Sequence, residues 1–321
     1  MKKPKIILIG TSPIMRSHLK AITESGMEPT AVASSNIHSC SHEKFAIENN
    51  IKKNYQNWDE MINEEKYDGI LIAARTESTI EILGHAIKQN VPILVEKPVS
   101  FSSQIIKKLI NDSHGQIIVG FNRRFYKTVN EVRNLISKEN KPVIASMIAP
   151  ESSDFRKFFD NAVHGIDLLR YIFGDIKLEH VKKLIVDDLQ KGFIATFSNE
   201  KNDIIQLIGN WNASDNFSLT IFQDKTKFEL KPFEELNIYN GINIIEPTDS
   251  IPIRKYQPKL VKRICLDSVD QYIKPGFFQQ CNAFSELIRN KTQSCSTASL
   301  TDTLKAIEIC EKLVGKYDDL L

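Results

Sequence analysis

The sequence predicts an α/β protein, with a doubly wound parallel sheet in its N-terminal part and a mostly antiparallel sheet with helices in its C-terminal part. In the first 120 residues, short apolar runs alternate with segments whose apolar residues recur at helical spacing. This alternation is typical of βαβ units, which build a parallel sheet. After residue 120 several strand-like segments follow one another with short turns, which favours an antiparallel or mixed sheet. A chain of 321 residues favours two domains, which we place at residues 1–120 and 121–321.

The elements of the first domain follow from these two periodicities, taken in chain order. Apolar runs predict strands at residues 5–9, 30–33, 69–73, 93–95 and 116–120. Helical spacing predicts helices at residues 16–25, 43–50, 78–89 and 102–111.

The second domain begins with a predicted helix at 128–138 and a strand at 142–148, and a helix at 164–173 then ends at Gly174. Further strands are predicted at residues 183–186, 192–197, 204–212, 217–223 and 225–230. Residues 249–275 are rich in Pro and Lys, and we expect an irregular loop there. The last two predicted helices cover residues 276–290 and 300–316.

The composition favours a globular protein of the cytoplasm. The net charge is +2 and the lysines are dispersed, which gives no electrostatic case for binding nucleic acid or a membrane. No apolar stretch approaches the roughly 20 residues that span a bilayer. The five cysteines have no paired spacing and no neighbouring histidine cluster, so we expect reduced thiols and no metal site.

The first candidate site is the turn after the first predicted strand, Gly10-Thr11-Ser12-Pro13-Ile14-Met15. Dinucleotide-binding folds place G-x-G-x-x-G here, for a tight turn, close approach to the pyrophosphate and close helix–strand packing. Only Gly10 is retained, because Ser12 and Met15 stand at the other two glycine positions. Ser12 can donate to a phosphate, and Pro13 suits a first helical turn. We expect Met15 to push the helix away from the strand or to fill space elsewhere; an ordinary turn that binds nothing is the alternative.

The turn after the second predicted strand reads Ala33-Ser34-Ser35-Asn36 and lacks the acidic residue that binds the ribose of NAD. Ser34, Ser35 and Asn36 can hydrogen-bond a 2′-phosphate, although no arginine follows. The sequence therefore leans weakly towards NADP over NAD, and a polar loop without a ligand is the alternative.

A lysine follows the predicted strand at 93–95, in the sequence Glu96-Lys97-Pro98. Ligands of open α/β sheets bind outside the carboxyl ends of the strands, which favours a functional role for Lys97. The alternative is a surface Lys–Glu pair, which contributes little stability.

Two further stretches carry candidate site residues. Asp160 and His164 are four residues apart and share one face of a helix, so the carboxylate can orient an imidazole that accepts a proton from a hydroxyl. Alternatively Asp160 caps the helix and His164 packs in the core. Arg123 and Arg124 lie between aromatic residues where the first domain ends, and they can bind an anionic or polyhydroxy substrate or form an interdomain hinge.

Taken together, these stretches resemble the glucose–fructose oxidoreductase / inositol dehydrogenase / rhizopine-catabolism (Gfo/Idh/MocA) family over almost the whole chain. The resemblance is carried by Glu96-Lys97-Pro98, Val119-Gly120-Phe121-Asn122-Arg123-Arg124-Phe125, Asp160-x-x-x-His164-x-x-Asp167-Leu168-Leu169-Arg170, Gly174, Ala283-Phe284 and residues 299–309.

The resemblance implies a Rossmann domain that binds NAD or NADP, followed by an α/β domain with an open sheet that binds substrate and mediates homo-oligomerisation, as a dimer or tetramer. The implied activity moves a hydride between the nicotinamide and a hydroxyl or keto carbon of a sugar, cyclitol or sugar nucleotide. Lys97 would contact the reacting hydroxyl and the nicotinamide ribose, His164 would be the general acid/base, and Asp160 would orient it.

The candidate cofactor-binding residues are Gly10, Ser12, Pro13, Ile14, Ser34, Ser35, Ala74, Arg75, Thr76, Glu96 and Lys97. The candidate substrate-binding residues are Arg123, Arg124, Arg156, Asp160 and His164. The three arginines and Lys157 are basic, which favours an anionic substrate such as a nucleotide sugar or sugar acid.

The sequence departs from the family pattern mainly around the cofactor. Besides the two lost glycines, Ala74-Arg75-Thr76 replaces the family's Thr-Pro-Asn, Thr79 replaces a common histidine, and residues 156–159 replace usual glycines. An altered cofactor pose or a permanently bound cofactor fits these departures. A non-catalytic sensor or partner subunit remains an alternative function, as does a reductase of imines or enamines.

Overall fold

The computed structural model describes residues 2–113, 116–139, 141–151, 157–290 and 292–315. The chain forms two compact units, one made of residues 1–125 with 268–321 and the other of residues 126–267. The first unit is thus discontinuous, because the last two helices belong to it. The division into domains at 1–120 and 121–321 stays a prediction about function, and the units below are those of the structure.

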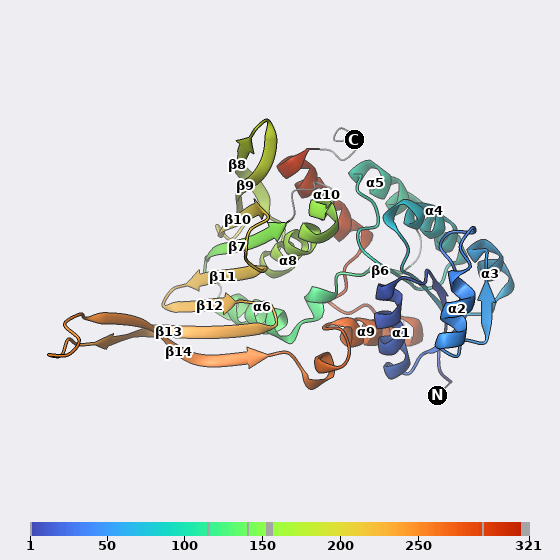
Figure 1. Ribbon diagram of the computed structural model, residues 1–321, viewed down its shortest axis with the longest axis horizontal. Coiled ribbons are helices and arrows are strands. Elements are labelled where there is room, and N and C mark those ends of the chain that lie inside the picture. Colours follow the sequence, from blue (N-terminus) through green and yellow to red (C-terminus); the bar gives the residue numbers. More distant parts are fainter. Residues whose placement is uncertain (1, 114–115, 140, 152–156, 291, 316–321) are drawn as a thin grey trace. The chain divides into compact units, whose positions relative to one another are not determined.

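The first unit contains a six-stranded parallel sheet in the order β3-β2-β1-β4-β5-β6 (Figure 1). Its strands are β1 (Lys5–Ile9), β2 (Glu28–Ala33), β3 (Lys53–Tyr55), β4 (Gly69–Ile72), β5 (Ile93–Val95) and β6 (Ile117–Val119). This is the strand order of a doubly wound Rossmann sheet, so the predicted fold class is confirmed. The short β3 and the helix α3 after it were not predicted.

The helices of the first unit are α1 (Pro13–Glu24), α2 (Ser41–Glu48), α3 (Trp58–Glu64), α4 (Thr76–Ala86), α5 (Ser103–Asp112), α9 (Phe277–Asn290) and α10 (Leu300–Val314). Residues of α1 and α9 share one hydrophobic core with Ile6, Leu71 and Leu94 of the sheet. The alternate strand residues, such as Ile7 and Ile70, are equally buried, so both faces of the sheet are covered.

The second unit contains an eight-stranded sheet in the order β14-β13-β12-β11-β7-β10-β9-β8, in which only β7 and β10 pair in parallel. Its elements are α6 (Lys127–Glu139), β7 (Ile144–Glu151), the π-helical turn η3 (Phe158–Ala162), α8 (Val163–Phe173), β8 (Lys177–Val186), β9 (Leu189–Ser198), β10 (Ile204–Trp211), β11 (Ser218–Gln223), β12 (Thr226–Leu230), β13 (Glu235–Ile245) and β14 (Lys255–Cys265). The mostly antiparallel second sheet is therefore confirmed.

The expected loop at residues 249–275 was wrong, because β14 occupies much of it. This strand is exposed over almost its whole length and carries Pro258, which an edge strand tolerates because one row of its backbone groups faces solvent. Beyond Asn240, β13 pairs only with β14, and the two form a ribbon that extends past the rest of the sheet (Figure 1).

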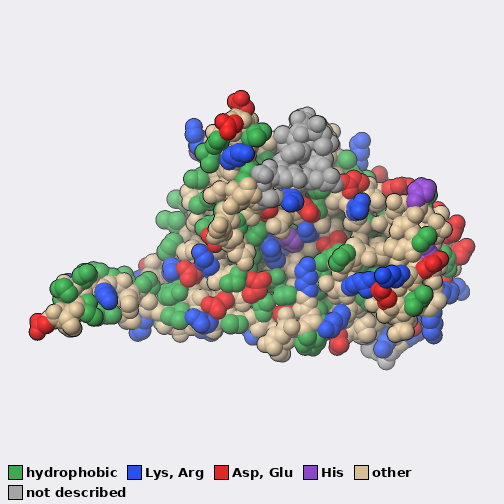
Figure 2. Space-filling view, viewed as in Figure 1, with side chains coloured by type: hydrophobic (Ala, Val, Ile, Leu, Met, Phe, Trp, Pro, Cys, Tyr) green, Lys and Arg blue, Asp and Glu red, His purple; other side chains and the backbone are tan. Residues whose placement is uncertain are grey.

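One face of the second sheet is apolar and exposed. Ile204 and Phe222 both pair with Ile144, so these three side chains lie on the same face, and each is about half exposed. Hydrophobic side chains also cover the β13–β14 ribbon in Figure 2. The exposed hydrophobic residues of these two strands include Ile242, Ile244 and Tyr256. Among the described residues, none of the helices has the length and apolar character needed to cross a membrane.

Candidate active site

The centre of the first sheet has the geometry of a nucleotide site. The chain order reverses between the neighbouring strands β1 and β4, and ligands of such sheets bind in the crevice beyond the carboxyl ends of these strands. Gly10 follows β1 with φ +106°, and a Cβ atom there would lie 2.3 Å from the carbonyl oxygen of Ala73. A glycine is therefore required at the first position of the predicted loop, both by its backbone conformation and by the close approach of the two strand ends.

The strand–turn–helix geometry is retained although Ser12 and Met15 stand at two glycine positions of the motif. Met15 is fully buried in the core shared by the sheet, α1 and α9, so its side chain fills core space. Ser12 is the N-cap residue of α1, and its hydroxyl donates to the Ala73 carbonyl at 3.4 Å, a long hydrogen bond. Pro13 opens the helix, where its missing N–H costs nothing.

The loop after β2 is tied together by its own hydroxyls. Ser34 is buried, and its hydroxyl lies 3.0 Å from the carbonyl of Ser39 and 3.1 Å from the hydroxyl of Ser41. Ser41 is also 2.7 Å from Thr11, which joins this loop to the turn after β1. Ser34 therefore shapes the loop, while Ser35 is half-buried. That either residue binds the cofactor stays a prediction.

The loop after β4 begins α4. Arg75 is exposed and is the N-cap residue of that helix, with Ala74 and Thr76 half-buried on either side. These three residues occupy the carboxyl end of β4, where the predicted nucleotide site lies.

A group of polar residues in the first unit surrounds Glu96, directly after β5. The carboxylate of Glu96 is 2.5 Å from Nε2 of His18, which is fully buried in α1, and it accepts a hydrogen bond from the backbone N–H of Lys97 at 3.2 Å. A Cβ atom on Gly120 would lie 3.0 Å from this carboxylate, so the glycine after β6 leaves room for it. Glu96 thus fixes the backbone from which the Lys97 side chain extends.

The charge of Glu96 is favoured by its partners. Burial alone would raise the pKa of this carboxyl, but the hydrogen bond from His18 and the positive charges of His18, Lys97 and Lys274 outweigh it and hold the pKa below its ordinary value. The sequence reasoning missed both His18 and Lys274. A histidine on the apolar face of the first helix was the available signal for His18.

Arg123 and Arg124, the two arginines predicted to bind substrate, have different surroundings. Arg124 is buried, donates to the carbonyl of Thr297 at 3.2 Å and lies 3.4 Å from the carboxylate of Asp302. Asp302 also completes the capping box of α10 with Ser299, so Arg124 ties the end of β6 to α10. Arg123 is half-buried in the same short helix, η2 (Asn122–Phe125). Substrate binding by either arginine stays a prediction.

Asp160 and His164 belong to the second unit. Asp160 is exposed within the π-helical turn η3, and His164 is 7% exposed in the first turn of α8. The N-cap residue of α8 is Ala162, so Asp160 lies inside a continuous helical segment and does not cap it. π-Helical turns occur frequently at functional sites. Arg156 lies outside the described residues.

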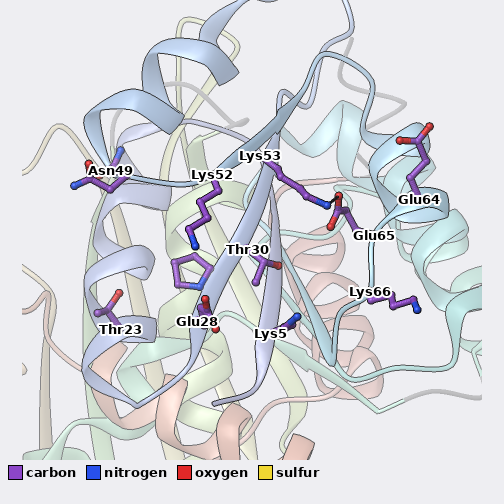
Figure 3. Close-up of a pocket in the computed structure, with 12 residues that line it drawn as sticks. Lys5, Thr23, Glu28, Thr30, Asn49, Lys52, Lys53, Glu64, Glu65 and Lys66 are labelled. Atoms are coloured by element: carbon purple, nitrogen blue, oxygen red, sulfur yellow. Dashed lines mark hydrogen bonds and ion pairs between the residues drawn. The ribbon is translucent and has the colours of Figure 1, made fainter. Parts of the chain in front are cut away.

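A large pocket of the first unit lies away from these residues. Its volume is 680 Å³, and Lys5, Glu28 and Lys53 on its wall stand at the amino ends of β1, β2 and β3 (Figure 3). Glu65 pairs there with Lys53 and Tyr55, each at 2.6 Å. Since ligands of this fold bind beyond the carboxyl ends of the strands, we do not assign the pocket to the active site. Among the described residues, no group of three or more His, Cys, Asp or Glu could hold a metal ion.

Comparison with known proteins agrees with this geometry. Residues 5–121 match the family model GFO_IDH_MocA, described as an oxidoreductase family with an NAD-binding Rossmann fold. Inositol 2-dehydrogenase of Salmonella typhimurium is 22% identical over 184 residues, which cover 52% of this chain and 54% of that protein. The chain thus matches only about half the length of such curated relatives.

The fold similarity extends over the whole chain. The structure of an oxidoreductase from Agrobacterium radiobacter in complex with NAD+, L-tartaric acid and magnesium superposes with a TM-score of 0.76 at 13% identity, covering 97% of this chain and 95% of that one. A dehydrogenase from Chromobacterium violaceum gives a TM-score of 0.78 at 17% identity, with 98% and 95% covered. At these identities the likeness establishes the fold.

Proposed function

We propose that the chain is an NAD(P)-dependent oxidoreductase of the Gfo/Idh/MocA family, whose model residues 5–121 match, and that it acts on a small polyhydroxy substrate. The proposed substrate is a sugar, cyclitol or sugar nucleotide, and the reacting carbon bears a hydroxyl or keto group. The observation that carries the proposal is the His18–Glu96 pair, which fixes Lys97 at the carboxyl end of β5.

The residues after β1 fit a dinucleotide. Gly10 makes the tight turn, α1 begins directly beyond it, and Met15 is withdrawn into the core, so it does not fill the turn. The amino end of α1 favours a pyrophosphate through its free N–H groups and its dipole. When bound, the nicotinamide cofactor supplies the hydride chemistry.

The protein residues would transfer the proton and orient the substrate. In the oxidation direction, the ammonium of Lys97 would donate a hydrogen bond to the substrate hydroxyl oxygen and His164 would accept the hydroxyl proton, while a bound nicotinamide cofactor would supply the acceptor for the hydride. In the reduction direction His164 returns that proton. General acid–base catalysis of this kind contributes about 10²–10⁴-fold in rate.

The cofactor is proposed to be NADP or NAD, with a weak preference for NADP. No carboxylate follows β2 to bind an unmodified ribose, and Ser35 and Asn36 are polar and at least partly accessible.

A homo-oligomer, either a dimer or a tetramer, is proposed on the basis of the second sheet. Ile144, Ile204 and Phe222 form an exposed apolar row across β7, β10 and β11, and a second copy of the chain would bury them. Light scattering behind size-exclusion chromatography measures the oligomeric state directly.

The first experiment is a fluorescence titration of nucleotide-free protein with NADH and NADPH. Binding of either cofactor supports the proposal and names the preferred one. Lys97→Ala and His164→Ala are then expected to abolish turnover of a substrate found by screening, while both variants stay folded. Lys108→Ala, an exposed lysine on α5, is the matched control and is expected to retain the wild-type rate. Unchanged turnover in Lys97→Ala and His164→Ala would contradict the proposed mechanism.

A non-catalytic family member is the second candidate, because Ser12 and Met15 replace two glycines and the Ser34 hydroxyl is used within its own loop. It predicts that folded, nucleotide-free protein binds neither NADH nor NADPH at millimolar concentration.

A further inference from the structure

The ribbon formed by residues 242–258 has one apolar face. Ile242 pairs with Pro258, and Ile244 pairs with Tyr256. Residues that pair across two antiparallel strands lie on the same side of the sheet, so these four side chains share a face. Ile244 is 55% exposed, and Ile242 and Tyr256 are each 61% exposed. The apolar face of the ribbon is therefore open to solvent.

The opposite face of the ribbon is mostly polar. Asn243 pairs there with Gln257, and the next pair joins Ile245 to Lys255. A two-stranded ribbon is marginally stable in water unless its hydrophobic face packs against something. Within this unit the ribbon strands pair only with each other, so a surface that covers the apolar face would stabilise the ribbon.

A bulge at Gly241 decides which side chains lie on the apolar face. From Tyr239 to Ile242 the strand β13 advances three residues while its partner β14 advances two. Gly241 has φ +76°, the left-handed conformation that a glycine bulge uses, and a Cβ atom there would meet nothing within 4 Å. Without the extra residue, Ile242 would point away from the face that carries Tyr239. The bulge reverses the alternation and brings Ile242 to that face.

The apolar face of the ribbon continues the exposed face of the sheet. Tyr239 pairs with Lys227, Lys227 pairs with Phe222, and Phe222 pairs with Ile144, so all four point to the same side. Phe222 and Ile144 belong to the exposed apolar row on which the homo-oligomer is proposed. The ribbon therefore extends the same face of the sheet past the end of its neighbouring strands.

The charge of this face favours a second copy of the chain as its partner. On the central strands β7 and β10 the outward-facing residues are uncharged, and they form the pairs Ile144–Ile204, Ser146–Gln206 and Ile148–Ile208. On β12 the outward-facing Lys227 and Glu229 neutralise each other at 2.9 Å. In a two-fold interface the same patch meets itself, so an unbalanced charge would be repelled by its own copy. This face carries no such charge on these three strands.

We propose that the β13–β14 ribbon is an arm that packs its apolar face against a second copy of the chain. A stable interface usually takes about 800 Å² from each partner, and the ribbon enlarges the apolar area that the sheet alone can offer. The inference rests on the homo-oligomer proposed above and is independent of the oxidoreductase activity.

The test is analytical ultracentrifugation of the full chain over a range of concentrations. Ile244→Lys and Tyr256→Lys each place a charge on the apolar face. Both are expected to raise the dissociation constant of the oligomer at least about tenfold, because the charge would have to be buried without a partner.

Asn243→Lys and Gln257→Lys are the matched controls. They add the same charge at neighbouring positions of the same two strands, but on the opposite face of the ribbon. Their dissociation constants are expected to stay within about twofold of the wild type, as for exposed substitutions.

Two measurements exclude a loss of folding as the cause of weaker association. Urea unfolding of each variant, followed by tryptophan fluorescence, is expected to give the midpoint of the wild-type protein. Ile244→Thr keeps a β-branched side chain suited to a strand and removes only apolar surface. It is expected to weaken association less than Ile244→Lys but measurably.

The proposal is overturned if Ile244→Lys and Tyr256→Lys associate as the wild type does, or if the two controls weaken association equally. An oligomer that ignores the apolar-face variants refutes the arm and leaves the interface to the sheet. A monomeric wild type refutes the arm and the homo-oligomer together. A monomer that binds phosphatidylcholine vesicles would assign the apolar face to a membrane instead. The cofactor titration decides the oxidoreductase proposal separately.

Discussion

Gly10→Ala is expected to destabilise the first unit strongly, because Gly10 combines positive φ with the closest backbone approach of the nucleotide loop. A Cβ atom would lie 2.3 Å from the oxygen and 2.8 Å from the carbon of the Ala73 carbonyl group, and both are backbone atoms of the strand end beside it. The unfavourable backbone conformation costs about 1–3 kcal/mol. Overpacking adds about 1–3 kcal/mol. We therefore expect a loss of about 2–6 kcal/mol in the free energy of unfolding.

Gly84→Ala is the matched control. Gly84 lies within α4, and a Cβ atom there would meet nothing within 4 Å. Alanine is favoured over glycine in a helix interior by about 1 kcal/mol, so this variant is expected to be more stable than the wild type. The same chemical change thus has opposite signs at the two positions.

The assay is urea unfolding followed by tryptophan fluorescence. The chain has two tryptophans, Trp58 in the first unit and Trp211 in the second, and a Trp211→Phe background leaves Trp58 as the reporter of the first unit. A lower midpoint at unchanged slope measures the loss of stability. A Gly10→Ala midpoint equal to or above that of the wild type would refute the close approach of the β1 and β4 ends.

The remaining predictions concern charge and the cofactor. Because the folded pKa of Glu96 lies below its ordinary value of 4.5, its charge stabilises the protein above that pH, and this stability is lost as the pH falls through the folded pKa. Urea unfolding at several pH values should show Glu96→Gln to be less pH-dependent than the wild type, and parallel curves would contradict this. His164→Asn should lower turnover by about 10²–10⁴-fold and remove one limb of the pH–rate profile, and a retained limb would assign the proton transfer elsewhere. Ser12→Gly should tighten NADPH or NADH binding by letting the backbone approach the pyrophosphate, and weaker binding in the titration would instead give the Ser12 hydroxyl a direct role.

The parts of the fold that were predicted correctly are those that bury apolar side chains. Strands β1, β4, β5 and β6 are buried throughout or nearly so, and each appears in the sequence as an apolar run. In contrast β3 reads Lys-Asn-Tyr and β14 is exposed over almost its whole length, so neither has a burial pattern to detect. Their strand conformation comes from pairing with a neighbouring strand, which a local pattern does not contain.

The site was predictable where a residue follows a recognisable strand, and not where the fold brings a distant segment to it. Lys97 was found because it follows an apolar run and precedes a proline. Lys274 lies 177 positions later in a stretch expected to be a loop, and only the return of α9 to the first sheet places it beside Phe277 and His18. Residues 126–267 separate this segment from the rest of the first unit in the sequence. The local sequence pattern around Lys274 therefore does not show which residues it contacts in the fold.

The unusual glycine loop is best understood through the same long-range packing. A residue with a large side chain at the third glycine position would separate α1 from the sheet if that side chain had to stay between them. Here α9 adds a second helix to the same core, and Met15 extends into the space that α1, α9 and the sheet enclose. The Gly10 turn keeps its required conformation, and Ser12 is accommodated at the Ala73 carbonyl. The loss of two glycines is therefore compatible with an intact strand–turn–helix geometry, so it does not by itself argue against a dinucleotide at this turn.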